Sequence, residues 1–146
     1  MDPKLCRFVQ AADLTRETNP WTQVEWMCNP KLVAADKLLL VRAYMEPGRS
    51  HPFHRHSHRE EIIYVLEGTA EQWVGKEHRI LKPGEIAHIP MNTVHGTYNP
   101  HAKPLTFLAI LSPANLPPEL AKDPDPLDVS TEEPWASMRK GFPPTT

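Results

Sequence analysis

The sequence predicts an all-β fold, a sandwich or barrel of short antiparallel strands with extended Pro-rich tails. Apolar runs recur through the middle of the 146-residue chain, and Gly or Pro separates them at intervals of about 8–12 residues. Eight of the 17 prolines lie between Pro113 and Pro144, which excludes a long regular helix or a central strand there. The regular structure should therefore lie in the middle of the chain.

Each expected strand is a short apolar or alternating run that ends at a turn signal. The run 61–66 is apolar on both faces, with Ile63 and Val65 predicted to point inward and Tyr64 outward. Trp21 and Trp26 indicate a further strand against the sheet edge. The expected strands are, in order, 38–45, 53–56, 61–66, 69–74, 78–81, 86–89, 94–98 and 105–111.

These strands divide the chain into one domain and two extensions. We expect an N-terminal arm with an edge strand in 1–37, a barrel in 38–112, and a Pro-rich extension in 113–146. The extension keeps apolar side chains that disordered segments usually lack, so it is expected to pack on the barrel or on a partner subunit. Those side chains are Leu116, Leu120, Leu127, Trp135 and Phe142.

Composition limits which binding partners and which cellular location we expect for this chain. The formal charge of −2 gives no reason to expect nucleic acid or an anionic membrane, and no segment has a helix-turn-helix pattern. No apolar run approaches the ~20 residues of a membrane span, and the first four residues do not open a signal peptide. Cys6 and Cys28 are too few and too distant for a disulfide framework. We expect a cytoplasmic protein with reduced thiols, the alternative being a disulfide between these two cysteines.

The segment 48–68 carries the strongest chemical signal. His54 and His56 are one residue apart, so their side chains point the same way on a strand. Glu61 opens the following apolar run and can lie on a neighbouring strand that faces the same interior. Two imidazoles and a carboxylate on one wall suit iron, nickel, zinc or manganese.

A second segment, 84–99, ends with His95 followed four residues later by Asn99. Together the two segments resemble the paired motifs of the cupin family. The first motif is filled by Gly48, His54, His56, Glu61 and Gly68, and the second by Gly84, Pro90, His95 and Asn99. Asn92 stands where the family usually has another glycine, and Asn tolerates the positive φ that such a position requires.

The resemblance covers roughly residues 38 to 113 and implies both a fold and a site. Cupins are double-sheet jelly rolls, also described as double-stranded β-helix barrels. By resemblance, a divalent transition metal (iron, manganese, nickel or zinc) is bound by His54, His56, Glu61 and His95. The family commonly forms homodimers, and a dimer would also cover the outward apolar side chains of the 61–66 run.

Other histidines near the motifs are expected to stay outside the site. Taking His56 and His58 as the ligand pair would leave only two residues before Glu61, short of the family spacing. We therefore expect His51 and His58 to be exposed loop residues. His88 is out of phase with its inward-pointing neighbours and should face the other side.

Three further residues are candidate substrate contacts. Gln72 shares the inward phase of its strand, and its buried amide needs partners, which a metal-bound molecule could supply. Arg42 and Tyr44 share a face of the 38–45 strand. If that face points inward, the guanidinium would suit a carboxylate substrate. The alternative is that these two residues lie on a surface face or at a subunit contact.

The implied ligand set predicts the type of chemistry. Three neutral imidazoles and one carboxylate leave a six-coordinate metal two open positions for water, oxygen or a bidentate substrate. Because the histidines and the glutamate act as ligands, few titratable groups remain for proton transfer. We therefore expect a metal-dependent enzyme acting on a small molecule, with a dioxygenase-type oxidoreductase favoured over an isomerase or lyase. The alternative is a non-catalytic cupin that binds a small molecule or a metal.

Overall fold

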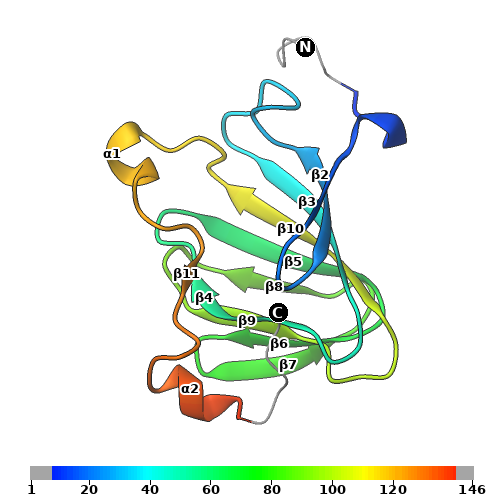
Figure 1. The fold of residues 1–146 in the computed structure, drawn as a ribbon, viewed down its shortest axis with the longest axis vertical. Coiled ribbons are helices and arrows are strands. Elements are labelled where there is room, and N and C mark those ends of the chain that lie inside the picture. Colours follow the sequence, from blue (N-terminus) through cyan, green and yellow to red (C-terminus); the bar gives the residue numbers. More distant parts are fainter. Residues whose placement is uncertain (1–7, 141–146) are drawn as a thin grey trace.

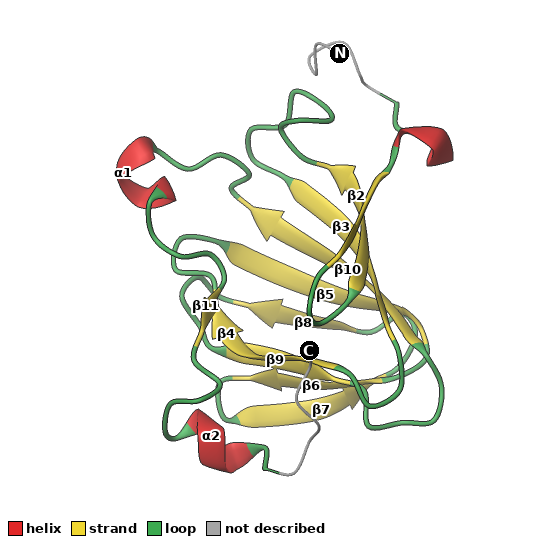
Figure 2. Cartoon of the chain, viewed as in Figure 1, coloured by secondary structure: helices red, strands yellow, loops and turns green. Residues whose placement is uncertain are grey.

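The computed structural model describes residues 8–140, which form two antiparallel sheets packed face to face (Figures 1 and 2). The expectations for Cys6, Phe142 and the first four residues fall outside the described residues. Described helical structure consists of a 3-10 turn, Ala11–Asp13, and two four-residue helices, α1 (Pro118–Ala121) and α2 (Trp135–Met138). The fold is therefore almost entirely β, as the sequence predicts.

The larger sheet has six strands and the smaller has five. The order in the larger sheet is β1 (Thr15–Thr18), β2 (Gln23–Cys28), β3 (Leu39–Met45), β10 (Leu105–Ser112), β5 (Glu60–Glu67) and β8 (Ile86–Ile89). The order in the smaller sheet is β11 (Leu127–Asp128), β4 (Ser50–Arg55), β9 (His95–Tyr98), β6 (Ala70–Val74) and β7 (Glu77–Leu81).

All eight strands expected between residues 38 and 111 are present, but two details differ. The described strands do not close into one continuous ladder, so the expected barrel is an open two-sheet sandwich. In addition, β4 begins at Ser50 rather than Phe53, because the chain pairs with β9 directly after the turn at Gly48. His51 therefore lies on a strand rather than in a loop.

The main core fills the space between the two sheets. Strand β5 alternates as predicted, with Ile63 and Val65 buried and Tyr64 36% exposed. Strand β10 alternates in the same way and pairs with both β3 and β5, so its inward side chains lie at the centre of the larger sheet. Burial of these apolar faces is the dominant contribution to the stability of the sandwich.

A second apolar cluster covers the outer face of the smaller sheet. Phe53, Trp73 and Tyr98 project outward from three adjacent strands, and Val129 and Trp135 from the C-terminal segment pack against them. Beyond α1, the chain passes the end of the larger sheet and continues through β11 to α2 beside the smaller sheet (Figure 1). The segment 113–140 thus lies against its own domain.

Two tight turns explain why Asn92 and Gly68 occupy their positions in the motifs. Asn92 has a φ of 61°, which confirms that an asparagine can replace the usual glycine at this position. Gly68 has a φ of 75°, and a Cβ there would lie 2.3 Å from the carbonyl oxygen of Pro104.

The described residues include no helix long and apolar enough to cross a membrane.

Candidate metal centre

Four side chains converge between the two sheets. The potential ligand atoms of His54, His56, Glu61 and His95 all lie within 4.8 Å of one another. His54 on β4 and His95 on β9 are paired across adjacent strands, and His56 follows the end of β4. Glu61 comes from β5 in the larger sheet. The cluster therefore bridges the two sheets, and the expectation that all ligands share one wall is wrong.

Hydrogen bonds fix the tautomer of each histidine in the cluster. The Nδ1–H of His54 donates to the Pro52 carbonyl (2.6 Å), and that of His95 donates to the Thr93 carbonyl (2.9 Å). The Nδ1–H of His56 donates to the Asp125 carboxylate (2.5 Å). Because a carbonyl oxygen can only accept, Nδ1 of His54 and His95 carries the proton and Nε2 keeps its lone pair. A metal ion would bind to these Nε2 atoms through their lone pairs.

The buried atoms of the cluster fit a metal ion. Glu61 Oε1 lies 2.8 Å from His95 Nε2 and 3.3 Å from His56 Nε2. Within residues 8–140, Glu61 Oε1 and His95 Nε2 are buried without a hydrogen bond of acceptable geometry. Buried polar atoms normally have partners, so this pair of atoms fits a bound ligand. A divalent cation would satisfy both atoms, and the donor set of imidazoles and carboxylate suits a transition metal.

Electrostatics favour a charged carboxylate on Glu61 and a neutral ring on His54. Burial acts to raise the pKa of Glu61, but the neighbouring rings of His95 and His56 outweigh it, so the pKa is lowered. Burial lowers the pKa of His54 well below its ordinary value, and the neighbouring histidines add to the shift. At neutral pH the cluster therefore presents an anionic carboxylate on Glu61 and a neutral imidazole on His54.

His51 belongs to the site, contrary to the expectation of an exposed loop residue. Its ring stacks on His54 (ring centroids 3.6 Å apart) and on Trp21 (4.2 Å apart). Its Nε2 is buried with no hydrogen-bond partner in the described part of the chain, and burial lowers its pKa to about 3. Strict alternation from His54 would point His51 to the opposite face, so starting the strand at Ser50 would not have predicted this position. The register of β4 shifts between His51 and His54, which brings both rings to the cavity.

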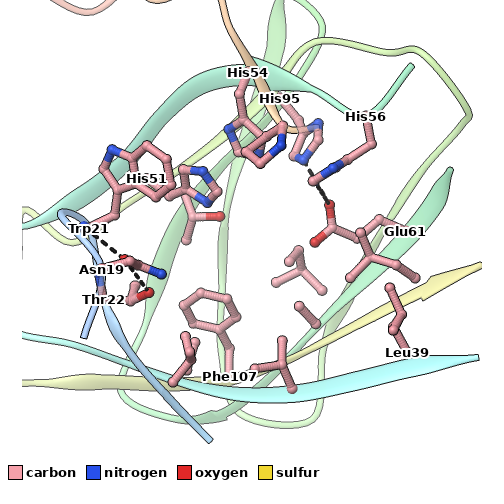
Figure 3. Close-up of a pocket in the computed structure, with 18 of the residues that line it drawn as sticks. Asn19, Trp21, Thr22, Leu39, His51, His54, His56, Glu61, His95 and Phe107 are labelled. Carbon is pink, nitrogen blue, oxygen red and sulfur yellow. Dashed lines mark hydrogen bonds and ion pairs between the residues drawn. The ribbon is translucent and has the colours of Figure 1, made fainter. Parts of the chain in front are cut away.

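The loop between β1 and β2 holds Trp21 in this stack. The side-chain oxygen of Asn19 accepts hydrogen bonds from the backbone N–H groups of Trp21 and Thr22 and from the Thr22 hydroxyl. Asn19, Trp21 and Thr22 all line the cavity (Figure 3). No motif in the sequence signals this contribution, because the loop precedes the first motif by almost thirty residues.

A cavity of about 230 Å³ lies beside the cluster. In Figure 3 the histidines gather on one side of it, while Phe107 and Leu39 lie on the other side. Most of that opposite wall comes from inward apolar side chains of the larger sheet, including Val24, Val41, Ala43, Ile63, Ala109 and Leu111. Arg59 and Asp125 also line the cavity.

The candidate substrate residues lie elsewhere. Arg42 and Tyr44 point to the outer face of the larger sheet, where both bind Glu25 (Arg42 Nη2 at 2.9 Å, the Tyr44 hydroxyl at 2.6 Å). They do not line the cavity, which corrects the inward alternative. Gln72 is buried as predicted, but its amide oxygen accepts from Thr97, and Thr97 rather than Gln72 lines the cavity.

The remaining histidines face other groups. His58 Nε2 hydrogen-bonds Asp123 (2.8 Å), so the ligand pair is not shifted to His56 and His58. His88 pairs with Glu60 (2.6 Å), and both side chains are more than half exposed. The expectation that His88 faces away from the interior is confirmed.

Known proteins match this chain in sequence and structure. Residues 41–111 match the family model described as "Cupin domain". An uncharacterized protein of Methanocaldococcus jannaschii is 30% identical over 87 residues, which cover 60% of this chain and 70% of that protein. Quercetin 2,3-dioxygenase of Bacillus subtilis is 40% identical over 42 residues, which cover 29% of this chain and 12% of the relative.

The chain spans less than a fifth of the length of several curated relatives, including that dioxygenase. Among solved structures, the polyketide cyclase RemF from Streptomyces resistomycificus has a TM-score of 0.64 and 26% identity, covering 77% of this chain and 82% of that one. With its two-sheet fold and paired motifs, the chain belongs to the cupin family.

Proposed function

We propose that this cupin is a metal-dependent enzyme of the dioxygenase type that oxidises a small organic molecule. One observation carries the proposal. The four candidate ligands, with an unsatisfied carboxylate oxygen and an unsatisfied imidazole nitrogen, border a mostly apolar cavity. Such a cavity with a few convergent polar groups is the usual setting for small-molecule chemistry.

Three histidines and a glutamate would hold the divalent metal in this proposal. When bound, such a metal supplies Lewis acidity and, if it is iron, the activation of oxygen. The apolar side chains of the larger sheet would exclude water from the reacting molecule. His51 Nε2, which has no partner within the described residues, is a polar atom available to a hydroxyl of that molecule.

The charge balance of the cavity favours a bidentate molecule of low charge, such as a catechol or a β-diketone, over a small dicarboxylate. Arg59 is the one Lys or Arg side chain among the described residues that line the cavity. All three of its guanidinium nitrogens already bind oxygens of this chain, from Pro113, Ala114 and Asp125. A dianionic substrate would therefore lack a free cation, whereas a catechol or a β-diketone needs only the metal and an apolar wall.

The similarity to quercetin 2,3-dioxygenase supports oxygen-dependent chemistry, and the similarity to the polyketide cyclase RemF supports a polyketide-like molecule as the occupant. Both are proposals for this chain, because the first match is short and fold alone does not determine activity.

The test combines elemental analysis with oxygen uptake. The purified protein, loaded separately with iron, manganese, nickel or zinc, is offered catechols, flavonols, β-diketones and oxalate. We expect uptake with a ring or diketone compound, loss of uptake in Glu61→Gln, and retention in His88→Ala, whose imidazole faces outward. Full iron occupancy without uptake or turnover across the panel would favour a binding protein. Turnover without oxygen consumption would favour an isomerase or lyase.

We also propose a homodimer formed by the outer face of the larger sheet. Tyr44, Tyr64 and Ile86 are 37%, 36% and 49% exposed on this face. The C-terminal segment packs on the other sheet, so a second copy of the chain is the occupant that we propose. Light scattering at micromolar concentration tests this, and a mass near the 16.6 kDa of one chain would overturn it.

A further inference from the structure

The three histidines of the cluster are anchored in two different ways. His54 donates to the carbonyl of Pro52 on its own strand, and His95 donates to the carbonyl of Thr93, two residues before β9 begins. Both anchors are therefore local in the sequence. His56 instead donates to the side chain of Asp125, which is 69 residues away in the C-terminal segment. A residue beyond the part of the chain that matches the cupin model (41–111) thus holds one candidate ligand.

Asp125 is itself fixed in place. Its second carboxylate oxygen forms an ion pair with Arg59 Nη1. The same guanidinium donates to the carbonyls of Pro113 (2.8 Å) and Ala114 (3.0 Å), where the segment leaves β10. Arg59 therefore ties together both ends of the excursion 113–125, which includes α1. The side chains of Asp125 and Arg59 are only 18% and 16% exposed, so the pair is shielded from competing water.

We propose that Asp125 is a positioning residue of the metal centre, and that segment 113–126 completes a site whose four ligands all lie within the cupin domain. The inference rests on the proposed metal binding. A carboxylate behind a metal-binding histidine fixes the ring orientation and raises the basicity of the nitrogen that faces the metal. Loss of such a partner typically weakens metal affinity about 10–100-fold.

The chain offers a matched control. Asp123 lies two residues away in the same segment and hydrogen-bonds His58, a histidine that is not in the cluster. Both aspartates join the C-terminal segment to the loop after β4, but only Asp125 contacts a candidate ligand. A general loosening of the segment should therefore appear in variants of both, whereas positioning of the metal should depend on Asp125 alone.

The experiment measures Co²⁺ and Zn²⁺ affinity by chelator competition for the wild type, Asp125→Ala, Asp125→Asn and Asp123→Asn. The visible spectrum of the Co²⁺ form and the melting temperature with and without metal are recorded for each. We expect about a 10–100-fold loss of affinity and an altered Co²⁺ spectrum in Asp125→Ala. Asp125→Asn, which keeps an acceptor oxygen but loses the charge, should show a smaller loss. Asp123→Asn should stay within about twofold of the wild type, because no cluster residue depends on it.

Each contrary outcome has a distinct meaning. A wild type that binds neither metal overturns the proposed metal binding and this inference with it. A wild type that binds metal, with unchanged affinity in both Asp125 variants, overturns the inference alone. Unchanged affinity with an equal fall in melting temperature with and without metal would mean that Asp125 only secures the segment. Asp125→Asn preserves the shape of the side chain, so the comparison stands even if Asp125→Ala fails to fold.

Discussion

The two sheets line the same cavity with different kinds of side chain. The smaller sheet supplies His51, His54 and His95, whose rings lie in close contact. The larger sheet supplies an apolar wall in which Glu61 is the charged exception. Among the described residues, the histidines of the opposite sheet are the groups that pair with this carboxylate in its apolar surroundings. A cation between the sheets would compensate the burial of its charge.

The outer faces of the two sheets differ as well. Segment 113–140 covers the smaller sheet around Phe53, while tyrosines and Ile86 stay exposed on the larger one. This cover lies behind β4, which carries His51 and His54 toward the cavity. The four predictions below test this division of roles between the walls and their outer faces.

The largest expected effect is the loss of bound metal when one of the four candidate ligands is replaced. Glu61→Ala, His54→Ala, His56→Ala and His95→Ala should each abolish stoichiometric metal binding, because each leaves an incomplete ligand set with buried polar atoms. Metal content per chain and the increase in melting temperature on metal addition are the measurements. His88→Ala is the control and should retain both. If the four variants keep full metal content, the metal centre is wrong.

The covered part of the smaller sheet should carry more stability than its exposed edge strand. Phe53 is 1% exposed, and Phe53→Ala should destabilise the protein by about 3–5 kcal/mol through loss of burial and a residual cavity. Ile80 lies on the edge strand β7 of the same sheet and is 45% exposed, so Ile80→Ala should cost about 1 kcal/mol or less. Urea unfolding of the two variants provides the comparison. Equal losses would show that segment 113–140 adds little packing.

The apolar wall should govern ligand access without affecting the metal. Ala109 points into the cavity from β10, so Ala109→Leu should fill part of it at a cost of about 1–3 kcal/mol in stability. We expect unchanged metal content and weaker binding of a catechol, measured by titration of the Co²⁺ form. Ile110→Leu on the outward face of the same strand serves as the control. Unaltered catechol binding in Ala109→Leu would place the ligand elsewhere.

The smallest effect is a pH dependence of the metal-free protein. Burial lowers the pKa of His51 to about 3, whereas the unfolded chain titrates near the ordinary value of about 6.5. Between these values the unfolded state binds one proton more, so the free energy of unfolding should fall as the pH falls from about 6.5 toward 3.

The slope from one histidine is at most about 1.4 kcal/mol per pH unit. Urea unfolding at pH 6.5, 5.5 and 4.5 should show a flatter dependence in His51→Gln than in the wild type. An identical dependence in the two proteins would mean that His51 is not buried as a neutral ring.

The sequence determined the parts of this protein that depend on local pattern. Strand alternation placed Ile63 and Val65 in the core, and turn chemistry explained Asn92 at positive φ. The resemblance to the paired cupin motifs grouped His54, His56, Glu61 and His95, which the structure brings within 4.8 Å of one another. Strand phase separated these residues from His88.

Only the tertiary structure decided which distant segments meet at the site. The partnership of Asp125 with His56, the stack of Trp21 on His51 and the outward position of Arg42 depend on how sheets and terminal segments pack. Such contacts span up to 69 residues and leave no periodicity in the sequence. Strand phase alone allows either face of β3 to point inward. The inward face of β3 is determined by the burial of Val41 and Ala43 against the opposite sheet. Arg42 then lies on the outer face, where it pairs with Glu25.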